Sequence, residues 1–229
     1  MRFYAACLAS YNNGVLHGRW IDASDDVDAM QDEINAMLRE SKFPNVTVSI
    51  PDYESAARAA GWTHETARFT GAPSFHRSGD KTAYQFDGWK DLCESEDIEP
   101  AEKLVPSAEE WAIHDFEGLP SGFGEYCGLQ TIADYAEIAE EFDYIDESNL
   151  AKIYDEFRDI EEMRDALRDN FAGIHNSFRD YSDDFAEEML HGAPDFATRY
   201  FDYESFARDL KMDMRVVDLD GGQVAIFHG

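Results

Sequence analysis

The sequence predicts an α+β fold, with strands at its beginning, helices through its middle and a β-hairpin at its end. Three observations support this prediction. Apolar runs near the N-terminus have the character of strands, apolar residues from Leu129 onward recur at helical spacing, and two β-branched runs near the C-terminus flank a Gly-Gly turn. With 229 residues, 44% of them hydrophobic and 14% aromatic, the chain is long enough for one large domain or a few small ones.

The first segments are strands with a helix between them. Residues 2–10 (RFYAACLAS), 17–22 (HGRWID) and 45–50 (NVTVSI) favour strands. Apolar residues at helical spacing predict a helix from about 25 to 40, and Ser24 is placed to cap it.

The segment 52–107 matches no regular pattern. It mixes Gly, Pro, aromatic and polar residues, as an inserted subdomain or a long loop does. At its end, Ser107 and Glu110 have the spacing of a helical capping box, yet residues 111–118 (WAIHDFEG) are equally typical of a strand, so this element stays open.

Helices predominate from Leu129 to Phe171. Three apolar stripes predict three helices, and Asp146 and Asp159 stand where the second and third need N-caps. The stripes are Ile132, Tyr135, Ile138, Ala139 and Phe142; Leu150, Ile153, Tyr154 and Phe157; and Ile160, Met163, Leu167 and Phe171.

The C-terminal part combines two helices with a hairpin. Residues 178–192 predict a fourth helix, and residues 202–212 predict a fifth helix with Asp202 as its cap. Residues 214–229 predict a hairpin whose strands join at Asp220-Gly221-Gly222. We expect four segments: an N-terminal α+β domain (1–51), an inserted segment of uncertain structure (52–107), a central, mainly helical acidic domain (108–172) and a C-terminal α+β domain (173–229).

The net charge excludes two classes of partner. Forty-nine acidic and nineteen basic residues give a net charge of −30 at pH 7. A surface that binds nucleic acid or anionic lipid must instead be basic. The first apolar run is too short for a secretory signal, and no later run approaches a membrane span. We therefore expect a cytoplasmic protein that binds neither nucleic acid nor membrane.

The acidity is concentrated in the second part of the chain. Residues 1–90 carry twelve acids and nine bases, whereas residues 91–229 carry thirty-seven acids and ten bases. Two zones contain no base: residues 104–151, with twelve acids, and residues 180–198, with six. We expect the acids of these two zones to lack basic partners.

The segment between the two zones, residues 152–179, is expected to neutralise itself. Glu161/Arg164 and Asp165/Arg168 have the i, i+3 spacing of ion pairs on one helix. By contrast, the helix predicted for 178–192 places Tyr181, Phe185 and Met189 on one face and five acids on the other. Like charges at i, i+4 on that acidic face each cost about 0.2–0.5 kcal/mol.

Motifs for catalysis or metal binding are weak. Asp218 and Asp220 resemble the start of a calcium loop, but the third carboxylate and the distal Glu are missing, which favours a hairpin turn. Seven histidines and three cysteines have no paired ligand spacing, and no GxSxG motif or glycine-rich phosphate loop is present. We expect no enzymatic activity, no cofactor and no metal site.

Three hypotheses account for the acidity. General solubility or halophilic adaptation would make residues 1–90 as acidic as the rest, which they are not. The second hypothesis is low-affinity calcium buffering, and the third is an acidic field presented to a basic DNA-binding groove. Duplex DNA carries one charge per ~1.7 Å of axis and a helix rises ~1.5 Å per residue. One helix with an acid at every fourth residue is therefore too dilute, whereas several packed helices or two subunits approach the charge density of a duplex.

Four strings, in this order, resemble the ArdA antirestriction proteins. The strings are Tyr11–Asp22 (YNNGVLHGRWID), Glu109–Pro120 (EEWAIHDFEGLP), Phe178–Leu190 (FRDYSDDFAEEML) and Tyr200–Leu210 (YFDYESFARDL). The last is the most specific. They frame nearly the whole chain except about 52–107, which looks like an insertion relative to shorter members.

The resemblance implies a DNA mimic of phage or conjugative elements that acts in the bacterial host cell. It implies an elongated chain of three small domains: an N-terminal sheet with a helix, a central helical bundle, and C-terminal helices with a β-hairpin. It further implies a homodimer without enzymatic activity. The implied partner is a type I restriction-modification enzyme, whose specificity and modification subunits form the DNA-binding site.

We predict that acids of the two base-free zones carry the mimicry and that Glu161 and Asp165 matter less. The predicted acids are Asp134, Glu137, Glu140, Glu141, Asp143, Asp146 and Glu147 in the first zone, and Asp180, Asp183, Asp184, Glu187 and Glu188 in the second. The alternatives are another basic DNA-binding target (a CRISPR effector, a nucleoid protein or a repressor), a calcium-binding or enzymatic acidic protein, and an acidic module without a target.

Overall fold

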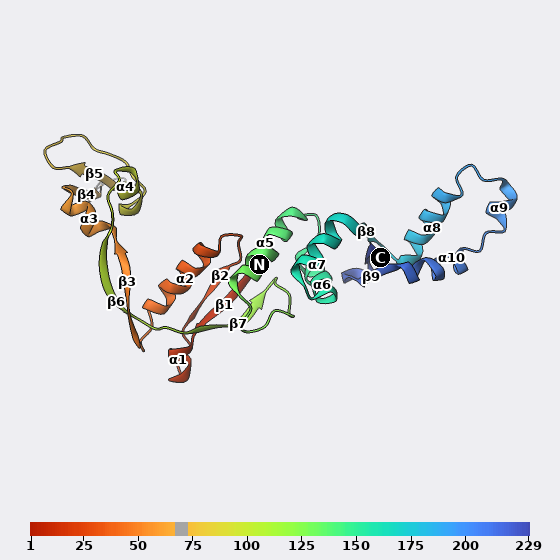
Figure 1. Cartoon of the computed structure of the whole chain (residues 1–229), viewed down its shortest axis with the longest axis horizontal. Coiled ribbons are helices and arrows are strands. Elements are labelled where there is room, and N and C mark those ends of the chain that lie inside the picture. The colour runs from red at the N-terminus through yellow and green to blue at the C-terminus, as the bar shows by residue number, and fades with distance from the viewer. Residues whose placement is uncertain (67–72) are drawn as a thin grey trace. The chain divides into compact units, whose positions relative to one another are not determined.

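The computed structural model describes residues 1–66 and 73–229, and its fold is mixed, as the sequence predicts. Residues 67–72, inside the segment expected to be an insertion, lie outside the described residues. Helices alternate with several small antiparallel sheets along the chain (Figure 1).

The chain divides into two compact units. One consists of residues 1–37 together with residues 110–229, and the other of residues 38–109, so the second interrupts the first in sequence. The four segments expected from the sequence stay a prediction.

The first sheet has the strand order β2-β1-β7. Strand β1 (Arg2–Cys7) lies between β2 (Gly18–Asp22) and β7 (Trp111–Glu117) and is antiparallel to both. The element that the sequence left open at 111–118 is therefore a strand. Gly18 is needed for the close approach of β2 to β1, because a Cβ on it would lie 2.8 Å from the Tyr4 ring.

Two predictions for the N-terminal elements are wrong in detail. The strand predicted for residues 2–10 ends at Cys7, where helix α1 (Leu8–Asn12) begins. Helix α2 (Val27–Arg39) is present as predicted, but Ser24 is not its cap. Asp26 takes that role: its Oδ1 accepts a hydrogen bond of 2.9 Å from Ala29 N, because Asp26 stands immediately before the first helical turn.

The strand predicted at residues 45–50 is confirmed as β3, and the rest of the second unit has regular structure that the sequence did not reveal. A two-stranded ribbon pairs β3 with β6 antiparallel, and a second pairs β4 with β5. The elements are β3 (Val46–Asp52), α3 (Tyr53–Ala59), β4 (Trp62–Thr66), β5 (Pro73–Arg77), α4 (Trp89–Ser95) and β6 (Ala101–Ser107). Ser107 ends a strand in this unit, so the capping box proposed for Ser107 and Glu110 does not form.

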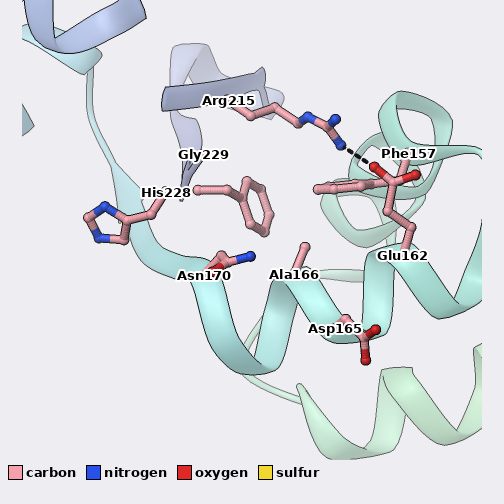
Figure 2. Close-up of a pocket in the computed structure, with 9 residues that line it drawn as sticks. Phe157, Glu162, Asp165, Ala166, Asn170, Arg215, His228 and Gly229 are labelled. Carbon is pink, nitrogen blue, oxygen red and sulfur yellow. Dashed lines mark hydrogen bonds and ion pairs between the residues drawn. The ribbon is translucent and has the colours of Figure 1, made fainter. Parts of the chain in front are cut away.

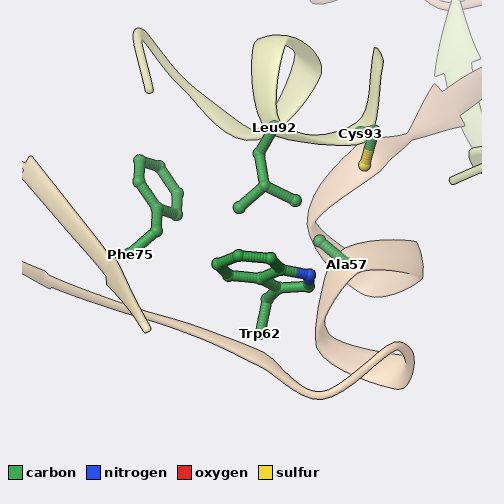
Figure 3. Close-up of a cluster of buried hydrophobic side chains, with 5 residues drawn as sticks. All are labelled: Ala57, Trp62, Phe75, Leu92 and Cys93. Carbon is green, nitrogen blue, oxygen red and sulfur yellow. The ribbon is translucent and has the colours of Figure 1, made fainter. Parts of the chain in front are cut away.

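An aromatic core holds the second unit together (Figure 3). Trp62 and Phe75 are each only 1% exposed, and they pack with Ala57, Leu92 and Cys93. Edge-to-face contacts extend the core, with ring centroids of Trp62 and Tyr84 separated by 5.3 Å. Each such pair contributes about 0.5–1.5 kcal/mol beyond burial. Residues 38–109 thus have a hydrophobic core of their own.

The three helices predicted from Leu129 onward are confirmed. They are α5 (Leu129–Glu141), α6 (Glu147–Phe157) and α7 (Ile160–Asp165). Asp146 and Asp159 cap α6 and α7 as predicted, since their side chains accept hydrogen bonds from Ser148 N and Glu162 N. After α7, one π-helical turn (Ala166–Asn170) follows, and Phe171 opens a strand, so its prediction as a helical residue is wrong.

The C-terminal sheet has the order β8-β10-β9, all antiparallel. The predicted hairpin is confirmed as β9 (Met214–Asp218) and β10 (Val224–His228), joined by a short 3-10 turn (Asp220–Gly222). The other elements are β8 (Phe171–His175), α8 (Phe178–Met189), α9 (Asp195–Arg199), α10 (Tyr203–Leu210) and a 3-10 turn at Lys211–Asp213.

Helix α8 packs on the C-terminal sheet. Tyr181 of α8 is buried together with Val224 and Ile226 of β10, and Phe178 and Leu210 pack against this cluster. Asp202 caps α10 as predicted, because its Oδ1 accepts a hydrogen bond from Ser205 N at 3.0 Å. Over the ranges 1–66 and 73–229, no helix combines the length and apolar character that crossing a membrane requires.

Replacing Phe75 with Ala tests the independent core. We expect Phe75→Ala to lower the free energy of unfolding of residues 38–109 by about 3–5 kcal/mol, because it empties a fully packed ring site. Hydrogen exchange measures this loss amide by amide. Leu104→Ala is the matched control, since Leu104 is 72% exposed in the same unit. The account of this core would be wrong if both variants kept wild-type protection.

Candidate functional site

Helix α5 positions the first group of predicted acids. Its apolar stripe buries Ile132, Tyr135 and Ile138, which turns the carboxylates of the helix away from the core. Four predicted acids lie on α5 and three follow it: Asp134, Glu137, Glu140 and Glu141, then Asp143, Asp146 and Glu147.

Two acids of this group have arginine partners, which contradicts the expectation for the first base-free zone. Glu137 Oε2 lies 3.0 Å from Arg164 Nη2. Glu141 accepts hydrogen bonds from Arg168 on both oxygens, with Nε 2.9 Å from Oε1. These hydrogen bonds hold the pKa of Glu141 below its ordinary value. Glu137 and Glu141 are therefore partly neutralised.

Of the two ion pairs predicted within residues 152–179, one forms and the other does not. Arg164 contacts Glu161 at 3.4 Å, as predicted, but it also reaches Glu137. Arg168 pairs with Glu141 instead of Asp165. The physical reason is that α7 packs on α5, so two arginines spaced by four residues face two glutamates with the same spacing. That matched i, i+4 spacing is the signal in the sequence that could have found the pairs.

Three more acids of the first group serve local structure. Asp146 Oδ1 caps α6 through Ser148 N at 3.0 Å, and Asp134 Oδ1 accepts from Gln130 Nε2 at 2.8 Å. Glu147 lies 3.4 Å from the amino group of Met1. Among the residues that the structure describes, no basic group pairs with the exposed Glu140 or Asp143.

Helix α8 positions the second group. Ser177 caps it, and Tyr181, Ser182 and Ala186 form its buried face. The sequence predicted that Asp183 lacks a basic partner, and this prediction is wrong. Arg179, one turn earlier on the helix, places its Nε 2.8 Å from Asp183 Oδ2. In the part of the chain that the structure describes, the four remaining acids have no ion pair: Asp180, Asp184, Glu187 and Glu188.

The apolar face predicted for α8 is shorter than expected. Tyr181 is buried, Phe185 is half-buried and stacks with Phe206, and Met189 is 64% exposed. Met189 is the last residue of the helix. An apolar side chain thus stands in solvent next to Glu188.

Both acidic helices place unpaired carboxylates at an unfavourable end. Neither α5 nor α8 has a base in its last turn, where Glu140 of α5 and Glu187 and Glu188 of α8 lie. The negative end of the helix dipole disfavours an acid there by about 0.3–1 kcal/mol. Repulsion between acids at i, i+4, such as Asp184 and Glu188, adds to this cost. These side chains therefore lower the stability of their own helices.

One pocket contains an arginine and a glutamate that contact each other (Figure 2). It has a volume of about 280 Å³ and is lined by residues of α6, α7, the π-helical turn and the C-terminal hairpin. Arg215 Nη1 lies 2.8 Å from Glu162 Oε1, and the Arg215 guanidinium stands 4.4 Å from the centroid of the Phe157 ring. Its arginine and glutamate are therefore engaged with each other.

The calcium hypothesis receives no support from the geometry. Asp220 of the predicted turn accepts hydrogen bonds from Ser148 and Lys152, and those bonds lower its pKa. Within residues 1–66 and 73–229, no three His, Cys, Asp or Glu side chains gather in a way that could hold a metal ion. What the unpaired carboxylates of α5 and α8 can do is attract a basic surface.

The chain matches the profile of one known protein family. The family profile described as "Antirestriction protein (ArdA)" matches residues 3–225, nearly the whole chain. No curated protein matches the chain.

Replacing Arg168 with Met tests the arginine assignment. Because Arg168 lowers the pKa of Glu141, we expect Arg168→Met to raise that pKa toward 4.5. NMR titration of the Glu141 carboxyl carbon measures the change. The ion pair stabilises the fold above the ordinary pKa, and its contribution is lost as the pH falls through the lowered pKa of the folded state. The variant should therefore be less stable than wild type at neutral pH and equally stable in acid. An unchanged pKa would refute the pairing, and Arg208→Met, whose partner is Asp209, is the control.

Proposed function

The chain belongs to the ArdA family of antirestriction proteins, and we propose that it inhibits type I restriction-modification enzymes by filling their DNA-binding groove with an acidic surface. The partner surface would be formed by the specificity and modification subunits. In this proposal the protein is a DNA mimic without catalytic activity or cofactor, and it acts in the cytoplasm of the bacterial host.

The observation that carries the proposal is the pattern of unpaired acids. Glu140 in the last turn of α5, Asp143 just after this helix, and Asp184, Glu187 and Glu188 on α8 are exposed carboxylates without an ion pair among the described residues. Those on the two helices lower the stability of their own helices. Electrostatic attraction to a basic DNA-binding groove would offset this loss of helix stability, because such a groove is built to bind a dense row of phosphates.

The high charge density of duplex DNA indicates that more than one acidic helix would have to take part in the interface. A single helix supplies less charge per unit length than a duplex, which carries one charge per ~1.7 Å. Acids from α5 and α8 used together would raise the density, and a homodimer would double their number. We include the dimer in the proposal for this reason.

Neutralising the acids of α8 should separate function from stability. We expect Asp184→Asn, Glu187→Gln and Glu188→Gln in one variant to weaken inhibition of a type I methyltransferase, because three attractive charges are lost. The same variant should melt at a higher temperature, because repulsion and the helix dipole no longer oppose α8. Inhibition is measured by DNA methylation and stability by thermal unfolding followed by circular dichroism. If this variant inhibits as well as wild type, the role proposed for the acids of α8 is wrong.

A matched pair of variants distinguishes exposed charge from net charge. Glu140→Gln with Asp143→Asn removes two unpaired acids, whereas Glu137→Gln with Glu141→Gln removes two acids that have arginine partners. Both change the net charge by the same amount. We expect the first variant to weaken inhibition about two- to thirtyfold, since each exposed ion pair with the target contributes about 0.2–1 kcal/mol, and the second to weaken it less. Equal losses would mean that only net charge matters.

The alternative target is another basic DNA-binding protein, such as a CRISPR effector, a nucleoid protein or a repressor. Affinity capture from a restricting host separates the two. Recovery of specificity and modification subunits supports the proposal, and their absence beside another DNA-binding protein contradicts it.

A further inference from the structure

The turn of the C-terminal hairpin is bonded to the first turns of α6. Lys152 Nζ lies 2.5 Å from Asp220 Oδ1, and Ser148 Oγ donates to Asp220 Oδ2 at 2.7 Å. The backbone N of Asp220 donates to Asn149 Oδ1 at 2.9 Å. One turn residue, Asp220, thus has three partners within five consecutive residues of α6. We call this set of four residues the α6–hairpin clamp.

The clamp is held in shape from both sides. On the helix side, Asp146 caps α6 through Ser148, and Asn149 is buried. On the hairpin side, Gly221 and Gly222 have φ values of +71° and +81°, a backbone conformation that residues with side chains rarely adopt. The turn therefore presents Asp220 to α6 in one geometry.

The clamp lies between the two groups of unpaired acids. On one side, α6 packs on α5 through Tyr154 and Tyr135, whose ring centroids are 6.0 Å apart, and α5 leads to Glu140 and Asp143. On the other side, strand β10 follows the turn and packs against Tyr181 of α8, the helix that carries Asp184, Glu187 and Glu188. A second contact reinforces the clamp, since Phe157 at the end of α6 meets Phe227 of β10 with ring centroids 5.2 Å apart.

We propose that Asp220 and Lys152 are positioning residues for inhibition, which fix the acids of the α5 region and of α8 at the separation that the target requires. The inference rests on the proposed function. It assigns Asp220 to the structure of the inhibitor and not to its acidic field, because its carboxylate is already occupied by Lys152 and Ser148.

Fixed separation matters because the two acid groups would act as linked binding elements. When two elements are held rigidly at the right distance, binding of the first raises the effective concentration of the second, and this advantage falls when the link is loose. The clamp would therefore affect how many charges engage at once, which the salt dependence of binding reports.

The test uses variants that break the clamp without changing net charge. Lys152→Met together with Asp220→Asn removes one positive and one negative charge. The matched control is Lys90→Met with Glu94→Gln, which removes an exposed ion pair of the same kind from the other unit. Each intact variant competes with a fluorescent duplex for a type I methyltransferase at several salt concentrations, below its unfolding temperature.

We expect the clamp variant to compete about tenfold more weakly than wild type, with a shallower dependence on salt, and the Lys90/Glu94 variant to match wild type. Ser148→Ala removes the hydroxyl that contacts Asp220 and the cap residue Asp146, and it removes no charge. It should give a smaller loss in the same direction, and Lys152→Arg should retain inhibition. Ser148→Ala and Lys152→Arg keep the test decisive if the double variant does not fold.

Two results have different meanings. If wild type displaces the duplex and both the clamp variant and Ser148→Ala displace it equally well with the same salt dependence, the positioning role is wrong, even if their melting temperatures fall. If wild type itself does not displace the duplex, the proposed function is wrong.

Discussion

Ion pairing within the acidic region decides which carboxylates remain available. Arg164 and Arg168 pair with the α5 acids Glu137 and Glu141, and Arg179 pairs with Asp183 on α8. Glu140, Asp143 and the last acids of α8 are left exposed, although helix dipole and like-charge repulsion both oppose them. The few bases of this region thus neutralise acids of the helices themselves, and the unpaired acids are the ones to which the proposed function assigns contact with a basic partner.

Local pattern predicted α2, the three helices that follow Leu129, α8, α10 and the C-terminal hairpin, because an apolar stripe or a Gly-Gly turn can be recognised within a short stretch of sequence. It did not predict the short helices α1, α3, α4 and α9. The same local pattern predicted the wrong ion-pair partner for Arg168. It assigned Arg168 to Asp165 on its own helix, whereas packing of α7 on α5 brings Arg168 to Glu141. Unpaired charge is a property of tertiary packing, so the sequence defined the acidic zones but not which of their members are neutralised.

The segment 52–107 escaped prediction for a different physical reason. Its strands β4 and β5 are short, and its core is made of aromatic rings such as Trp62 and Phe75 that meet across four separate elements. Such a core leaves no periodic stripe in the sequence. Because residues 38–109 bury their own hydrophobic cluster and interrupt the other unit in sequence, the acidic helices and this unit have separate cores. The acids that carry the proposed function all belong to the first unit.

The most direct test is competition between the wild-type protein and a labelled DNA duplex for a type I methyltransferase, measured across salt concentrations. If the acidic surface takes the place of DNA, the protein displaces the duplex completely, in a mutually exclusive manner. Its apparent affinity then falls by about tenfold or more between about 50 and 200 mM salt, as expected when several charges engage a basic groove. A ternary complex of enzyme, duplex and protein, or an affinity that is independent of salt, would contradict the account.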